Sequence, residues 1–213
     1  MISVLVLATA TTFAQSDPGR VGSFSFPETE PPGFDCVYRR LSSEDRAISQ
    51  QRVVTRLEAA SRDDKARPND PTEKDRKKRS IAVSSQCQEE FNFDDWQMND
   101  WISKYTNALN TAEVTSRYLD RSDASRIADA VRSLSPADLA TLREKHPKNA
   151  DAVFIRLMQA VFKTDKALDR RLLIYSGAYL TSLIAIRDTR LRWADWRRAE
   201  DAKAQAKAAA QAR

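Results

Sequence analysis

Glycine is scarce in this chain of 213 residues. Only four glycines are present, at Gly19, Gly22, Gly33 and Gly177. Walker-type phosphate loops and the dinucleotide-binding fingerprint both need several closely spaced glycines, because the backbone must turn sharply against the phosphates. From Asp35 to the C-terminus Gly177 is the single glycine. The sequence therefore excludes both nucleotide-binding motifs and disfavours tight β-hairpins.

The residues of common metal and catalytic sites are also scarce. One histidine, His146, and two cysteines, Cys36 and Cys87, cannot supply the four ligands of a His/Cys zinc site. His146 precedes Pro147 at the predicted end of a helix, where a cationic side chain stabilises the helix dipole. We therefore expect no metal and no cofactor, and we assign no catalytic residue.

Residues 1–14 contain no charged side chain. Thr12 and Ala14 provide the small residues that signal peptidase requires, which predicts a signal peptide over 1–14 and a mature chain that starts near Gln15. The basic residues that usually begin a signal peptide are absent. The run is too short to cross roughly 30 Å of hydrocarbon as a helix. We expect an exported, periplasmic or secreted protein; the alternative is a buried N-terminal helix.

Export predicts the redox state of the two cysteines. Disulfides form in oxidising compartments, and Cys36 and Cys87 are the only partners available within the chain. A loop of this length would contribute on the order of 4 kcal/mol in the chain-entropy model. The sequence predicts a Cys36–Cys87 disulfide, with two unpaired buried thiols as the alternative.

The distribution of proline and of apolar residues divides the mature chain into three parts. Residues 15–40 hold most of the glycines and half of the prolines, which predicts an extended or disordered leader. Residues 41–193 show apolar positions at helical spacing, which predicts a helical domain. Residues 194–213 are polar and alanine-rich and predict a helical tail. The expected fold is all-α: a single irregular helical bundle with a long projecting C-terminal helix.

Capping residues and apolar periodicity predict where the helices start. We expect starts at Ser43, Thr72, Asn99, Ser122, Ser135 followed by Pro136, about Asn149 and about Thr164. The uncharged stretch 172–186 is shorter than a membrane span. It predicts the central core helix.

An acidic and aromatic cluster follows the second predicted helix. Carboxylates beside aromatic rings can form an acid/base pair or bind a hard cation, although the spacing does not match an EF-hand. The alternative is structural, because acids at a helix start are stabilised by the helix dipole. The cluster comprises Glu89, Glu90, Asp94, Asp95 and Asp100, interleaved with Phe91, Phe93, Trp96 and Trp101.

Basic residues concentrate in two places, in a chain of net charge +5. One is the segment 187–213 and the other is a short run near residue 76. No nucleic-acid recognition motif accompanies them, and export argues against nucleic acid, so the expected partner is an anionic envelope component or a partner protein. Solvated charged faces are the alternative. The candidate interaction residues are Lys74, Arg76, Lys77, Lys78, Arg79, Trp96 and Trp101.

Because no catalytic constellation is present, we expect a non-enzymatic binding or structural protein of the cell envelope. A carboxylate-dependent envelope hydrolase that uses the acidic cluster is a less favoured alternative. The better-placed alternative is a periplasmic chaperone-like protein: Leu41-Ser42-Ser43-Glu44 and Leu134-Ser135-Pro136-Ala137 resemble the Leu-Thr-x-x-Gln motif of small periplasmic helical chaperones. Both segments lack the glutamine, so the resemblance identifies no family.

Overall fold

The computed structural model describes residues 26, 28–62, 73–143, 153, 156, 157, 159, 161 and 169–211. Within these ranges every regular element is helical, which confirms the predicted all-α fold. The predicted signal peptide, residues 15–25 and 27 of the leader, and His146 lie outside the described residues.

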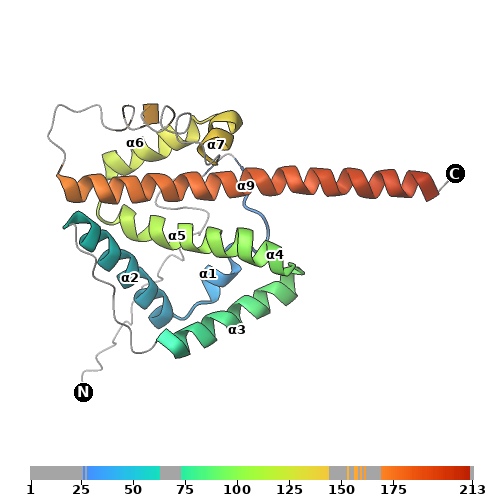
Figure 1. Ribbon diagram of the computed structural model, residues 1–213, viewed down its shortest axis with the longest axis horizontal. Coiled ribbons are helices and arrows are strands. Elements are labelled where there is room, and N and C mark those ends of the chain that lie inside the picture. Colours follow the sequence, from blue (N-terminus) through green and yellow to red (C-terminus); the bar gives the residue numbers. More distant parts are fainter. Residues whose placement is uncertain are drawn as a thin grey trace, which may run out of the picture.

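The C-terminal helix α9 (Arg170–Gln211) is the axis of the fold. Helix α5 (Ser103–Ser116) packs along one side of it, and α6 (Arg121–Arg132) and α7 (Pro136–Arg143) cover another (Figure 1). Helix α2 (Ser43–Ser61) contacts both α5 and α9. The stretch 172–186 supplies the centre of the core, where Tyr175, Tyr179, Leu180, Leu183 and Ile186 are almost completely buried. Among the described helices none is long and apolar enough to cross a membrane.

Three more helices and one π-helical turn belong to the described part of the fold. Helix α1 (Cys36–Arg40) is joined by the Cys36–Cys87 disulfide to α3 (Glu73–Phe91), which confirms the predicted pair. Helix α4 (Asp95–Gln97) then runs into a π-helical turn, η1 (Met98–Ile102), and into α5. Cys87 is fully buried, so the disulfide lies inside the core.

The described part of the leader is ordered by packing. Residues 36–40 are helical where we expected extended chain. Phe34 is completely buried, and its ring lies 4.9 Å from that of Trp193 on α9. A segment rich in proline and glycine cannot form a long helix, yet one large aromatic residue is enough to anchor it in the core.

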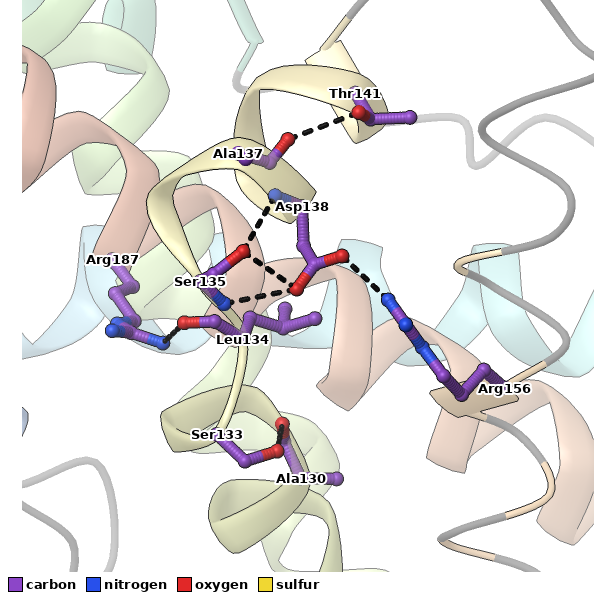
Figure 2. A network of polar contacts seen from close by, with 9 residues as sticks. All are labelled: Ala130, Ser133, Leu134, Ser135, Ala137, Asp138, Thr141, Arg156 and Arg187. Carbon is purple, nitrogen blue, oxygen red and sulfur yellow. Dashed lines mark hydrogen bonds and ion pairs between the residues drawn. The ribbon is translucent and has the colours of Figure 1, made fainter.

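Two helix starts follow the expected capping chemistry. Ser135 accepts a hydrogen bond from the backbone N–H of Asp138 and precedes Pro136, the first residue of α7 (Figure 2). For α2 the cap is Ser42, one residue before the predicted Ser43. Val153, Leu157 and Val161 are helical and buried, in agreement with the apolar face predicted from about Asn149.

Three predicted starts are wrong. Asn99 caps nothing, because it lies inside the π-helical turn; the cap is Asp94, whose side chain accepts from the N–H of Gln97. Asp120, rather than Ser122, caps α6. Helix α9 starts at Arg170, after the non-helical Asp169. In the first two cases a nearby aspartate outcompetes the predicted residue because its charged oxygen is the stronger acceptor.

Candidate functional site

An aromatic pocket opens where α9 leaves the body of the protein. It encloses about 390 Å³. The rings of its wall come from two segments, the end of α3 with the residues after it, and α9. The lining consists of Pro32, Phe91, Asn92, Phe93, Gln97, Trp193, Trp196 and Arg197; we call this set the aromatic pocket.

The chain turns sharply to form one wall of the aromatic pocket. Phe91 is the last residue of α3, and Asn92 adopts a left-handed backbone conformation with φ of 52°, which asparagine tolerates better than most residues. Phe93 follows, and Asp94 then caps α4. Gly33 also has positive φ, at 80°, and a Cβ there would lie only 2.4 Å from the Phe91 ring. The absence of a side chain at Gly33 therefore lets the leader lie directly against Phe91.

The rings of the aromatic pocket are held by other rings. Phe91 and Phe93 stack with centroids 5.8 Å apart, and Trp193 and Trp196 lie 4.9 Å apart. Buried Trp101 contacts both α9 indoles, at 5.1 Å from Trp193 and 5.5 Å from Trp196. Such edge and stacked contacts fix ring orientation, so the wall is organised before any ligand arrives.

The polar groups of the aromatic pocket are two amides and one guanidinium. Gln97 is buried, and its Oε1 accepts a hydrogen bond from the Asp94 N–H at 2.8 Å. Asn92 and Arg197 are exposed. Within the described part of the chain, Arg197 makes no hydrogen bond and no ion pair. Its charge is therefore available at the rim.

The two tryptophans predicted as interaction residues occupy different environments. Trp96 is 48% exposed, and its ring lies 4.7 Å from that of Trp101. Trp101 is only 2% exposed and belongs to the core. Trp96 is therefore accessible to a partner, whereas Trp101 packs against the rings of Trp193 and Trp196.

The acidic cluster is dispersed over separate structural contacts. Glu90 pairs with Arg40, Asp94 caps α4, and Asp95 accepts from Gln88. The Lys104 ammonium hydrogen-bonds Asp100 and lowers the pKa of that carboxyl. Glu89 is exposed. None of these carboxylates lines the aromatic pocket.

No metal site is formed by the part of the chain that the structure describes. It contains no group of three or more histidine, cysteine, aspartate or glutamate side chains placed to hold an ion. The hard-cation hypothesis for the acidic cluster therefore has no geometric support there.

The basic run on α3 is partly neutralised. Arg79 donates two hydrogen bonds to the buried carboxylate of Asp45 on α2, and the Arg79 guanidinium holds the pKa of Asp45 below its ordinary value. Lys78 lies 4.0 Å from Asp75. Arg76 also has an interaction partner, while Lys74 and Lys77 are exposed. The run is thus an irregular face and not a single cationic patch.

Two arginines of the segment 187–213 are buried. Arg187 donates to Glu28 Oε1 at 2.9 Å and to the carbonyls of Val131, Arg132 and Leu134 at 2.6 to 3.0 Å (Figure 2 shows its contact with Leu134). Val131 and Arg132 lie in the last turn of α6, and Leu134 lies just after it, where carbonyls lack the N–H partners of a helix interior. The Val131 carbonyl also accepts from the backbone N–H of Leu134. Arg187 therefore joins α6, α9 and the leader.

Arg190 makes the companion network one turn later. Its Nε donates to the Tyr105 hydroxyl at 2.9 Å, and that hydroxyl donates to Glu30 Oε1 at 3.0 Å. Arg190 Nη2 also lies 3.3 Å from Glu30 Oε2. Burial raises the pKa of Glu30 and that of Tyr105, against the opposing effect of the Arg190 charge. The sequence hypothesis of a solvated basic segment missed both arginines.

Neither family models, nor curated proteins, nor solved structures gave a match to this chain when compared with it.

Proposed function

We propose that the protein is an exported, non-enzymatic binding protein of the cell envelope that holds an apolar group of a partner in the aromatic pocket. The observation that carries the proposal is the wall of four aromatic rings, Phe91, Phe93, Trp193 and Trp196, around about 390 Å³. That volume is near the lower end of the roughly 300 to 1,000 Å³ typical of ligand sites. Aromatic walls bind well because they offer large apolar area and lose few torsions on binding.

The chemistry of the lining favours binding over hydrolysis. Asn92, Gln97 and Arg197 are its polar members, and no carboxylate, histidine, cysteine, serine or lysine belongs to it. Acid/base and nucleophilic mechanisms use such groups, or a tyrosine or threonine, and neither of these two lines the pocket either. A chaperone-like role has less support, because the large exposed apolar residues of the described ranges lie in separate segments: Ile81 in α3, Trp96 in α4, Tyr118 after α5 and Leu173 in α9.

Two observations support export. The predicted signal peptide ends before Gln15, and the Cys36–Cys87 disulfide is typical of proteins that fold in an oxidising compartment. Mass spectrometry of the extracytoplasmic fraction should find a chain that starts near Gln15. Recovery of the protein only in the cytosol with Met1 intact would contradict export and leave the pocket proposal standing.

Binding can be tested with a matched pair of exposed positions on α9. The probe is N-acetyl-4-fluorophenylalaninamide, followed by its ¹⁹F line width. Arg197→Trp places a ring at the rim of the aromatic pocket and should abolish saturable broadening. Arg198→Trp, at a neighbouring residue that pairs with Asp195 and does not line the pocket, should bind like the wild type. No saturable broadening in the wild type, or equal binding by both variants, would contradict the proposal.

A further inference from the structure

The aromatic pocket carries one positive charge, and no described residue pairs with it. Of its polar lining groups only Arg197 is ionised, and it makes no ion pair within the described ranges. The nearest aspartate along α9, Asp195, pairs with Arg198. An unpaired guanidinium at the edge of an apolar wall attracts an anion more strongly than a fully hydrated one, because the wall excludes part of the water.

The two acids that follow the α3 wall of the aromatic pocket are held by other groups. Asp94 Oδ1 accepts from the Gln97 N–H, and Asp95 accepts from the Gln88 amide at 2.7 Å. Neither residue lines the pocket. On α9 itself, Glu200 pairs with Lys203, and Asp201 makes no ion pair with Arg197. Arg197 is therefore free to pair with a carboxylate of a bound partner.

Two amide side chains accompany the rings. Asn92 is exposed, and Gln97 uses its Oε1 on the Asp94 N–H but makes no hydrogen bond through its NH₂ group to a described residue. Side-chain amides can donate to and accept from a peptide main chain. Aromatic residues and arginine are enriched at protein–protein interfaces, and asparagine supplies adaptable hydrogen bonds in antibody binding sites.

We propose that the aromatic pocket recognises a segment of a partner protein in which a carboxylate neighbours an aromatic residue. The ring packs among Phe91, Phe93, Trp193 and Trp196, and the carboxylate pairs with Arg197. This inference rests on the proposed function and adds the charge of the ligand to it. A membrane is less well matched, because among the described residues no extended exposed apolar patch surrounds the pocket.

The test compares two probes that differ only in charge, N-acetyl-Glu-Phe-amide and N-acetyl-Gln-Phe-amide. The wild type should bind the Glu peptide about two- to fivefold more tightly, as expected of a partly exposed ion pair. Added salt should reduce the preference. Arg197→Gln should abolish it, and Arg198→Gln, the matched exposed control, should retain it.

The outcomes separate the two proposals. Equal affinity for both peptides, or a preference that survives Arg197→Gln, would overturn the proposed pairing of a ligand carboxylate with Arg197. The aromatic pocket would then remain an apolar site. Failure of both peptides to bind overturns the proposed function as well. Binding to phosphatidylglycerol vesicles that depends on Arg197, without discrimination between the peptides, would replace the protein segment with a lipid surface.

Discussion

Arg187 Nε donates to Glu28 Oε1 at 2.9 Å, across 159 residues of chain. Both side chains are largely buried, so the pair exchanges water for protein contacts on both sides. Such a pair is costly to break, because the remaining charge is left buried without compensation. The contact makes the leader part of the folded domain.

Removal of the Arg187 side chain tests this contact. Arg187→Ala leaves Glu28 unpaired and removes a donor from three carbonyls at and just after the end of α6. We expect a loss of about 3 to 5 kcal/mol in the free energy of unfolding, measured by urea denaturation. Arg192→Ala, the control on the same helix, should cost less than about 1 kcal/mol. Similar losses for the two variants would contradict a specific role for Arg187.

The sequence predicted the fold better than it predicted the site. Apolar spacing on α9 and the Ser135-Pro136 cap are local signals, and the cysteines had only one way to pair. The burial of Arg187 and Arg190 depends on glutamates about 160 residues away, Glu28 for the first and Glu28 and Glu30 for the second. Nothing local distinguishes these arginines from the solvated basic residues that follow them.

The sequence indicated some residues of the aromatic pocket but not that they lie together. Phe91 and Phe93 were recognised as part of an acidic and aromatic cluster, and Trp193 and Trp196 mark the end of apolar positions on α9. These four rings come together only in the tertiary structure, where Phe93, just after α3, packs against Trp193 on α9. The singled-out Trp101 is a support in the core.

The two described glycines predict opposite responses to alanine. At Gly33 a Cβ would clash with Phe91 at positive φ, so Gly33→Ala should destabilise the fold by about 2 to 5 kcal/mol and disturb the aromatic pocket. At Gly177 a Cβ would meet nothing within 4 Å, and α9 would gain about 0.5 to 1 kcal/mol from the better helix former. Thermal denaturation should show a lower Tm for Gly33→Ala and a higher Tm for Gly177→Ala. A stabilising Gly33→Ala would show that the leader does not lie against Phe91.

The buried carboxylate of Asp45 predicts an acid-sensitive contribution to stability. Hydrogen bonds from Arg79 and Ser42 hold its pKa below the ordinary value of 3.8 in the folded protein. The unfolded state then binds the proton more readily, so stability rises with pH across this window. The contribution is complete above pH 3.8 and is lost as the pH falls through the lower, folded-state pKa.

The variant Asp45→Asn lacks this dependence. Urea denaturation between about pH 2 and 6 should show its stability deficit shrinking toward the acid end. Arg79→Gln should lose the same acid-dependent component, because Arg79 is the largest cause of the lowered pKa. A deficit that grows as the pH falls would contradict the assigned sign.

The end of α9 should contribute little to stability. Residues 201–211 are exposed throughout and are rich in alanine, lysine and glutamine, which favour helix without burying it. Truncation after Arg198 keeps Trp196 and should change Tm by no more than about 1 to 2 °C. A decrease in Tm of more than about 5 °C, measured by differential scanning calorimetry, would mean that the tail packs against the body or against a second copy.

The four indole N–H signals of the protein offer the most direct test of the aromatic pocket. Each tryptophan gives one cross-peak in a ¹H–¹⁵N spectrum, assigned with single Trp→Phe variants. Titration with N-acetyl-phenylalaninamide should shift the Trp193 and Trp196 signals together in a saturable way, because both rings line the pocket. Exposed Trp96, which lies outside the lining, should shift least. Shifts confined to Trp96, or no saturable shift at Trp193 and Trp196, would contradict the central claim.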